Sequence, residues 1–499
     1  MAYSMTFPGL VGYVRETGYM CDRFDPYSKK WLQTPFDCNA KGDVRLEGRE
    51  QYHLALYMEY MSQKNLDFLT SIPYQCFTEL SLEMTEIVSL APIGSLKNLT
   101  TLELSRSHGS NLRDAITDMD WSWLEQLPSL QHMALEDFPL SHVDLRFLTR
   151  TPRLSTLSFH RSALNNDHLY HLTELTNLAE LDLRETRVSP KGLHALQRFP
   201  SLDTLRISGK KYTDELADSL LSLKQLSYLN FENTNLTDKM LSKILESCPL
   251  STTKIDSSPI QWHISSQQSN LRRLSISNCP LDSASLAYLG EIESLQSLHL
   301  RGVKVSAVDM KNLDALQKLE HLSLEYIEMR DVLSTEMPRV AQLHSCTIYD
   351  TPIDAKFCKL LGMSPHLERL EFQEESFDDA CLLTLQNLSQ IQVLSLQSTG
   401  VSSSGFLELQ HCSQLQKLYL FNAHLTRENL LVFSRLPNLR YMRIAECTLD
   451  SPEGLYELQQ LSGLYVDSYS FPYEYGYHIE KEMELRTHLP NCEIVYYWY

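Results

Sequence analysis

The sequence lacks the features that mark membrane proteins, nucleotide-binding enzymes and zinc proteins. None of its 499 residues falls in an apolar run of about 20, the length that a membrane-spanning helix needs. Its 17 glycines are scattered singly, so no glycine-rich loop is present to hold a phosphate group. Its 11 cysteines form no C-x-x-C pair and no zinc-spaced cluster with histidine. We therefore expect no cofactor, no bound metal and no catalytic residues.

Basic residues are also few. Lys and Arg number 44 against 63 Asp and Glu, which gives a formal charge of −19. Nucleic acids and anionic membranes are bound largely through Lys and Arg, so we expect neither as a partner. The N-terminus, MAYSMTFPGLVGYVRETGYM, has neither the basic stretch nor the apolar segment of a secretory signal. Together with cysteines that we expect to be free thiols, this predicts a cytoplasmic protein; the alternative is an effector delivered into a host cell. We also expect a monomer.

A repeat of 24 residues dominates the chain. Leu178, Leu202 and Leu226 each open a copy of the pattern L-x-x-L-x-L. Alternating leucines at the fourth and sixth positions predict a strand with one buried face. A Ser-Pro pair at Ser189 and apolar residues three apart after it predict a short helix. One strand and one helix per repeat give a parallel sheet on a concave face and helices on a convex face.

These repeats resemble those of leucine-rich repeat proteins. About 18 copies follow one another over residues 77–494. The ninth position lacks the family's usual Asn, which resembles the cysteine-containing and bacterial-type subclasses; it holds Thr186, Thr234, Cys279, Thr351, Thr399 and Cys447. The resemblance implies an α/β fold, a leucine-rich repeat solenoid of horseshoe shape.

The ends of the chain depart from the repeat. Residues 1–76 carry no repeat, and we expect an N-terminal cap there, with a helix over about residues 49–62. Residues 54–73 distantly resemble the middle of an F-box. Residues 495–499 are predicted to form an aromatic C-terminal tail. Within the repeats, the step from Leu250 to Leu271 shrinks to 21 residues, and residues 114–120 form an acidic loop.

Two sets of side chains are candidates for binding on the concave face, to which the third, fifth and seventh positions of each repeat point. The first is aromatic and basic, the usual composition of an interface hot spot; its members are Tyr349, Lys417, Tyr419, Phe421, Tyr441, Arg443 and Tyr465. The alternative is that the tyrosine-rich tail folds over these residues as a cap. The second set is acidic and favours a basic ligand; its members are Glu136, Glu180, Asp182 and Glu232.

The sequence thus predicts a non-catalytic scaffold or adaptor that binds a protein partner through its concave face. One alternative is an F-box-like substrate receptor of a ubiquitin ligase. A second alternative is an enzyme with its active site in residues 1–76, although no catalytic constellation is present there.

Overall fold

The computed structural model describes residues 2–7, 11–25, 30–39, 42–47, 54–62, 66–71, 77–86, 89–106, 120–138, 140, 143–264, 270–329, 342–384, 390–467, 470 and 477–497. The chain divides into two compact units, Met1–Leu250 and Ser251–Tyr499. The sequence predicted one uninterrupted solenoid from residue 77 to 494. The boundary between the units falls at the 21-residue step, where TTKIDSSPIQWHISS replaces the helix pattern.

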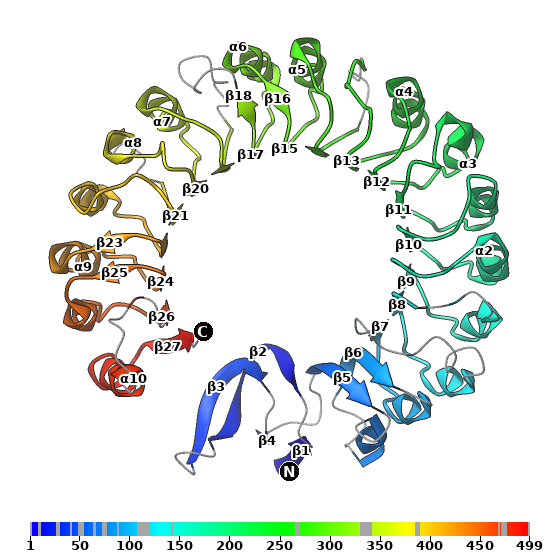
Figure 1. Cartoon of the computed structure of the whole chain (residues 1–499), viewed down its shortest axis with the longest axis horizontal. Helices are drawn as coiled ribbons and strands as arrows, with labels where there is room; N and C mark the ends of the chain where they lie inside the picture. Colours follow the sequence, from blue (N-terminus) through cyan, green and yellow to red (C-terminus); the bar gives the residue numbers. More distant parts are fainter. Residues whose placement is uncertain are drawn as a thin grey trace. The chain divides into compact units, whose positions relative to one another are not determined.

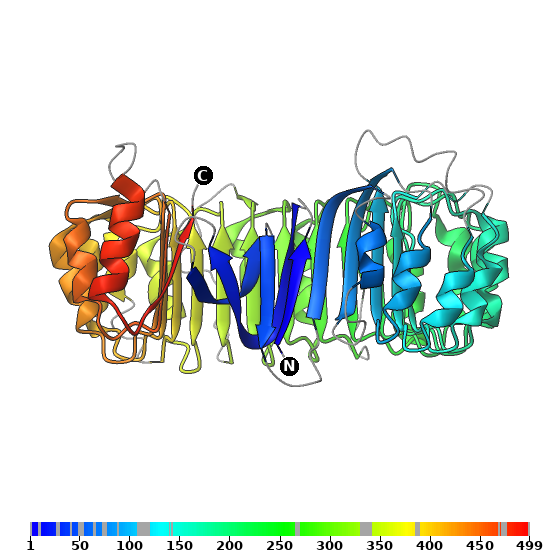
Figure 2. The same cartoon turned by 90° about the horizontal axis from the view of Figure 1, so that it is seen from below.

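The sheet of unit 1 begins with antiparallel strands and continues with parallel ones. The first four strands, in dark blue in Figure 2, pair antiparallel, and the second of them also pairs antiparallel with β5. From β5 onward neighbouring strands are parallel. The strands are β1 (Ala2–Phe7), β2 (Val11–Asp25), β3 (Lys30–Asn39), β4 (Gly42–Glu47), β5 (Leu54–Ser62), β6 (Phe77–Glu86), β7 (Thr101–Arg106), β8 (His132–Glu136), β9 (Thr156–Ser158), β10 (Glu180–Leu183), β11 (Thr204–Ser208) and β12 (Tyr228–Glu232).

Unit 2 has a parallel sheet of the same kind. Its strands are β13 (Thr252–Asp256), β14 (Arg273–Ser277), β15 (Ser297–Arg301), β17 (His321–Glu325), β19 (Ser345–Tyr349), β20 (Arg369–Gln373), β21 (Val393–Gln397), β22 (Lys417–Phe421), β24 (Tyr441–Ala445), β26 (Gly463–Asp467) and β27 (Glu493–Tyr497). Two small ladders join β16 (Lys304–Val305) to β18 (Glu328–Met329) and β23 (His424–Leu425) to β25 (Thr448–Leu449).

Short helices cover the outer side of each sheet (Figure 1). In unit 1 they are α2 (Asn166–His171), α3 (Ala217–Leu221) and α4 (Asp238–Ser247), with 3₁₀ helices at Asp67–Ser71, Ala91–Ser95, Ser122–Gln126, Leu145–Arg150, Leu172–Glu174, Gly192–Arg198 and Asp214–Leu216. In unit 2 they are α5 (Ser283–Gly290), α6 (Ala307–Met310), α7 (Ala355–Leu361), α8 (Asp379–Thr384), α9 (Arg427–Ser434) and α10 (Tyr477–His488), with 3₁₀ helices at Lys311–Ala315, Gly405–His411 and Pro452–Glu457.

The core of each unit lies between the sheet and these helices. Leu181 and Leu183, the fourth and sixth residues of one repeat, are fully buried. In unit 2, Leu298 and Leu300 are buried to the same degree. The repeat therefore sets the strand register, as the sequence predicted, and the α/β solenoid is confirmed. Each unit has the fold of a leucine-rich repeat solenoid.

The side chain at the ninth position of the repeat contacts backbone carbonyl oxygens in the two repeats described next. The buried Thr186 hydroxyl donates to the carbonyl oxygen of Leu183 at 2.8 Å. The thiol of Cys447 lies 3.3 Å from the carbonyl oxygen of Ala445. Thr186 and Cys447 thus each contact a backbone carbonyl oxygen inside the core.

The eighth position turns the chain after each strand. Its residues have a positive φ in most repeats, between 42° and 59° where they are not glycine, although this region is unfavourable for most side chains. The turn directs the backbone N–H toward the next repeat: the N–H of Arg161, for example, donates to the carbonyl oxygen of Arg184 at 3.1 Å. The residues are Asp137, Arg161, Glu185, Gly209, Asn233, Ser257, Asn278, Gly302, Tyr326, Asp350, Ser398, Asn422 and Glu446. Gly, Asn and Asp, which adopt a positive φ more readily than other residues, occupy about half of these positions.

The predicted helix over residues 49–62 is wrong. Residues 54–62 form strand β5, which pairs in parallel with β6. In the sequence Leu54, Leu56 and Met58 alternate with other residues, and a period of two indicates a strand. An F-box is built of helices, so the strand weighs against the F-box resemblance of residues 54–73. At the other end, β27 runs to Tyr497, past the predicted end of the repeats at residue 494.

Candidate protein-binding surfaces

Six of the seven predicted aromatic and basic residues lie on three adjacent strands of unit 2. Strands β22, β24 and β26 are neighbours in register, with Lys417 opposite Tyr441, Tyr419 opposite Arg443, and Arg443 opposite Tyr465. We call these six residues the aromatic strip: Lys417, Tyr419, Phe421, Tyr441, Arg443 and Tyr465. Tyr441 is 41% exposed. The other five are half-buried.

Two cations of the aromatic strip lie over aromatic rings of the neighbouring strand. The ammonium nitrogen of Lys417 is 5.4 Å from the centre of the Tyr441 ring. The guanidinium carbon of Arg443 is 4.9 Å from the centre of the Phe421 ring. Contacts of this kind are worth about 0.5–1 kcal/mol each at exposed sites. They hold flexible side chains in place on a face that solvent and partners can reach.

Gly463 makes room for the Tyr441 ring. A Cβ atom at this position would lie 2.8 Å from the Cδ1 atom of Tyr441 and 3.6 Å from the Cε2 atom of Tyr465. The ring of Tyr441 therefore lies across the glycine of the next strand, close to Tyr465. The sequence offered this signal, because Gly463 replaces a side chain at the third position of its repeat.

Tyr349, the seventh predicted residue, lies apart from the aromatic strip. It belongs to β19, and strands β20 and β21 separate it from β22. Its hydroxyl donates to the Oε2 atom of Glu371 at 3.4 Å, and burial and the charge of Glu371 raise its pKa. Burial also raises the pKa of Tyr419, on which Glu371 acts as well. Glu371 thus lies between Tyr349 and the strip.

The described part of the C-terminal segment extends the solenoid. Strand β27 pairs in parallel with β26, and Tyr465 faces Val495 in the register. Helix α10, in red in Figure 1, lies in the outer row, where His488 stacks on Tyr456 at 4.1 Å between ring centres. These elements add one more repeat beside the aromatic strip. Tyr469, Tyr473 and Tyr475 of the predicted cap lie outside the described residues.

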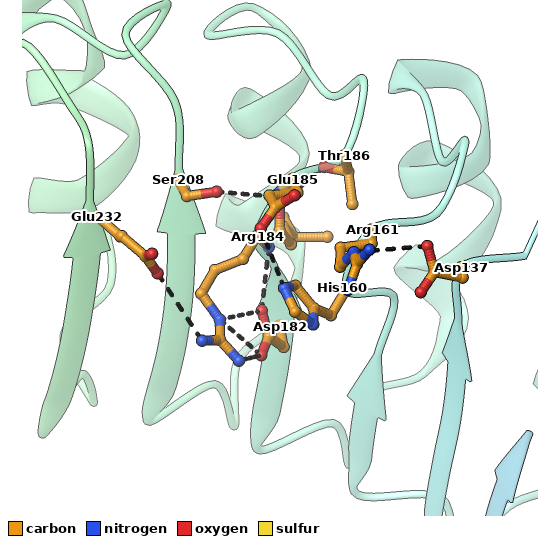
Figure 3. A network of polar contacts seen from close by, with 10 residues as sticks. Asp137, His160, Arg161, Asp182, Arg184, Glu185, Thr186, Ser208 and Glu232 are labelled. Atoms are coloured by element: carbon orange, nitrogen blue, oxygen red, sulfur yellow. Dashed lines mark hydrogen bonds and ion pairs between the residues drawn. The ribbon is translucent and has the colours of Figure 1, made fainter. Parts of the chain in front are cut away.

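The acidic candidates of unit 1 are largely paired with arginines of their own sheet. Asp182 is buried, and its carboxylate accepts hydrogen bonds of 2.7–3.1 Å from the Arg184 side chain (Figure 3). These bonds raise the pKa of Arg184. Arg184 also lies 3.9 Å from Glu232, and Arg206 lies 3.5 Å from Glu180.

The remaining acidic candidate, Glu136, lies at the end of β8, and its charge also acts on Arg184. The Nε2 atom of His160 lies 3.4 Å from a carboxylate oxygen of Glu185 (Figure 3). Arg184 and Arg206 therefore offset part of the negative charge that suggested a basic ligand in unit 1.

A depression in unit 2 was not predicted from the sequence. It has a volume of about 460 Å³ and lies where strands β17, β19, β20 and β21 begin. Its walls are the second and third residues of four successive repeats. The rule that positions three, five and seven point inward does not include the second position, which precedes the strand. The sequence therefore did not predict the depression.

Two expectations from the sequence concern metals and membranes. Across the part of the chain that the structure describes, no three His, Cys, Asp or Glu side chains converge as metal ligands would. No helix in that part has both the length and the apolar character needed to cross a bilayer.

Comparison with known proteins finds similarity among solved structures alone. No protein-family model matches the chain. No curated protein matches it either. A plant peptide hormone receptor, RGFR1 in complex with RGF2, is 16% identical, with a TM-score of 0.38, over 82% of this chain and 66% of the receptor chain.

Two further solved structures are similar to a comparable degree. The mouse RP105/MD-1 complex has 12% identity and a TM-score of 0.45, over 83% of this chain and 91% of that one. An internalin from Listeria monocytogenes, inlF, has 14% identity and a TM-score of 0.26, over 85% of this chain and 88% of that one. At such low identities and TM-scores these proteins say nothing of the partners of this chain.

Proposed function

We propose that the chain is a protein-binding module whose partner lies on the aromatic strip of unit 2. The observation that carries this proposal is the pairing of each cation with an aromatic ring on the inner face of the sheet, Lys417 with Tyr441 and Arg443 with Phe421. Tyr and Arg at the centre of an interface supply most of its binding free energy.

The contrast with unit 1 supports the choice of surface. There the carboxylates of Asp182, Glu180 and Glu232 lie beside Arg184 and Arg206. A ligand that bound these carboxylates would have to displace the arginines that contact them. At the aromatic strip the ring of Tyr441, which is 41% exposed, can be contacted by a partner.

The charge of the aromatic strip also indicates the chemistry of the partner. Lys417 and Arg443 form a basic patch on a chain of net charge −19. A partner surface that combines carboxylates with apolar groups would complement both the cations and the rings. The sequence predicted a basic ligand for the acidic residues of unit 1. We propose instead a partner whose surface is acidic where it contacts the aromatic strip.

We also propose the role, oligomeric state and location of the chain. The chain acts as an adaptor without catalysis of its own, as a monomer in the cytoplasm, with delivery into a host cell as the alternative. The F-box-like role is the weaker candidate because residues 54–62 form strand β5.

Affinity capture with matched variants tests the proposal. The full chain with Tyr419→Ala, Tyr441→Ala and Arg443→Ala should lose a protein that the wild type captures. The control carries Tyr170→Ala and Arg153→Ala; Tyr170 is 44% exposed, close to the 41% of Tyr441, and belongs to unit 1. The proposal fails if both variants capture the same proteins as the wild type, or if both lose them equally.

A further inference from the structure

The depression at the start of strands β17–β21 has two carboxylates that form no ion pair with any residue the structure describes. Glu320 and Glu368 belong to its walls. Among the described residues, no ion pair engages either side chain. In unit 1, by contrast, Glu180 and Glu232 have arginine neighbours. The two glutamates therefore remain available to a ligand.

His344 lies between Glu320 and Glu368 in the sheet. The carbonyl oxygen of Glu320 accepts a hydrogen bond from the N–H of His344 at 2.7 Å, and the N–H of Glu368 donates to the carbonyl oxygen of His344 at 2.9 Å. The three residues are thus successive rungs of the sheet, each at the second position of its repeat. Adjacent strands lie about 4.8 Å apart, so the backbones of Glu320 and Glu368 lie on either side of that of His344.

The ring of His344 is held in place by its own neighbours. Its Nδ1 atom donates to the carbonyl oxygen of Gln342 at 2.8 Å, because a carbonyl oxygen can only accept. Its other contact is with His366, whose ring is nearly parallel at a centre-to-centre distance of 5.6 Å. The depression therefore combines a fixed flat ring with two acceptor groups.

Carboxylates beside a flat ring match one side chain best. The guanidinium of arginine is planar, donates five hydrogen bonds in a fixed fork, and stacks on aromatic faces. We propose that this depression binds the guanidinium group of an arginine in a protein partner, with Glu320 and Glu368 as acceptors and His344 as the stacking surface. The inference rests on the proposed function, because it adds a second contact to the same partner.

The depression and the aromatic strip lie on one row of the sheet. Arg369, Val393, Lys417 and Tyr441 are matched in register on successive strands β20–β24. The positive charge of Arg369 acts to lower the pKa of Tyr419. Arg369, a cation in the wall of the depression, therefore lies on the side that faces the aromatic strip. A single extended segment of the partner, running across the strands, can reach both places.

The strand spacing sets the distance between the two contacts in the partner. Three steps from β19 to β22 cover about 14 Å, which an extended chain spans in about four residues. The partner segment should therefore carry an arginine about four residues away from an acidic residue. The acidic residue meets Lys417 and the arginine meets the depression.

Selection of peptides on the full chain tests this inference. A random 12-residue peptide library displayed on phage is selected against the wild-type protein, and the enriched peptides are synthesised. We expect an arginine about four residues from an aspartate or glutamate. Replacing that arginine by the neutral, similarly shaped citrulline should weaken binding at least tenfold by isothermal titration calorimetry.

Variants of the chain then assign the effect to the depression. The double variant Glu320→Gln, Glu368→Gln should bind the arginine peptide at least tenfold more weakly and should no longer distinguish it from the citrulline peptide. The control, Glu293→Gln with Glu428→Gln, removes two exposed carboxylates outside the depression and should bind as the wild type does. Thermal melting of each variant monitors folding.

The outcomes separate this inference from the proposed function. If peptides need Lys417 and Tyr441 but bind equally well to the Glu320→Gln, Glu368→Gln variant, the inference is wrong and the proposed function stands. If enriched peptides contain no arginine, the inference is also wrong. If no peptide is enriched, or if those enriched bind equally well to the variant with three alanines in the aromatic strip, both are wrong.

Discussion

The guanidinium carbon of Arg443 lies 4.9 Å from the centre of the Phe421 ring, one strand away on the inner face of unit 2. The two residues sit diagonally, because Arg443 is opposite Tyr419 in the register and Phe421 is opposite Ala445. The small side chain of Ala445 leaves the space beside Phe421 open to the arginine. The contact therefore places a positive charge above an aromatic ring where a partner can reach both.

Removing this contact should affect stability slightly and binding strongly. A double-mutant cycle with Arg443→Ala and Phe421→Ala should give a coupling of about 0.5–1 kcal/mol in urea unfolding. Truncation of Arg443 should cost about 2 kcal/mol or more in binding, about thirtyfold in affinity, if it is a hot spot. Equal losses in both measurements would assign Arg443 a structural role only.

Gly463 offers a test in which no residue of the aromatic strip is replaced. A Cβ atom there would come within 2.8 Å of the Tyr441 ring, so Gly463→Ala should displace the ring and weaken partner binding. The fold should tolerate the change, because an exposed ring can move. Gly209→Ala is the control: Gly209 has a φ of 119°, so alanine there should lower the melting temperature and leave binding intact. The account of Tyr441 is contradicted if Gly463→Ala binds as tightly as the wild type.

Asp182 should matter for stability and not for binding. Its carboxylate is buried and accepts three hydrogen bonds from the Arg184 side chain. Asp182→Ala leaves Arg184 half-buried without this partner, and we expect a loss of about 1–3 kcal/mol in the free energy of unfolding. Urea unfolding measures the loss, and partner capture should be unchanged. Loss of capture without loss of stability would indicate that the binding site lies in unit 1.

Core leucines should be costly to truncate. Leu181→Ala and Leu298→Ala each remove a fully buried side chain from a strand, and we expect a loss of about 2–5 kcal/mol. Denaturant unfolding of the full chain measures it. Variants as stable as the wild type would show that the strand register is misplaced.

The buried cysteines should react slowly. Burial raises the pKa of Cys346 to about 12 and that of Cys447 to about 11. The reactive species is the thiolate, and at pH 8 it is a very small fraction of a thiol with so high a pKa. Alkylation at pH 8, followed by peptide mapping, should label both residues far more slowly in the native than in the denatured protein. Equal rates would contradict their burial.

The sequence predicted the repeating part of the fold because one constraint acts in every copy. Leu181 and Leu183 must face the core, and their spacing fixes strand and register together. The first 76 residues have no such repetition, and the apolar residues at Leu54, Leu56 and Met58 were assigned to a helix although they alternate as in a strand. A pattern that occurs once is easily assigned the wrong period.

The candidate surfaces were predictable to different degrees. The aromatic strip followed from position alone, because Lys417 and Tyr441 occupy the same place in successive repeats. The pairing of Asp182 with Arg184 could also be predicted, since residues two apart share one face of a strand. The depression could not be predicted by the same rule, because Glu320, His344 and Glu368 precede their strands.

Hydroxyl-radical footprinting of the chain with its captured partner tests the central claim most directly. Tyr441, Tyr170 and Tyr326 are 41%, 44% and 42% exposed, so all three should be labelled in the free protein. We predict that the partner protects Tyr441, together with Tyr419 and Phe421, and leaves Tyr170 and Tyr326 labelled as before. Unchanged labelling of Tyr441 in a saturated complex would contradict the claim that the aromatic strip is the binding surface.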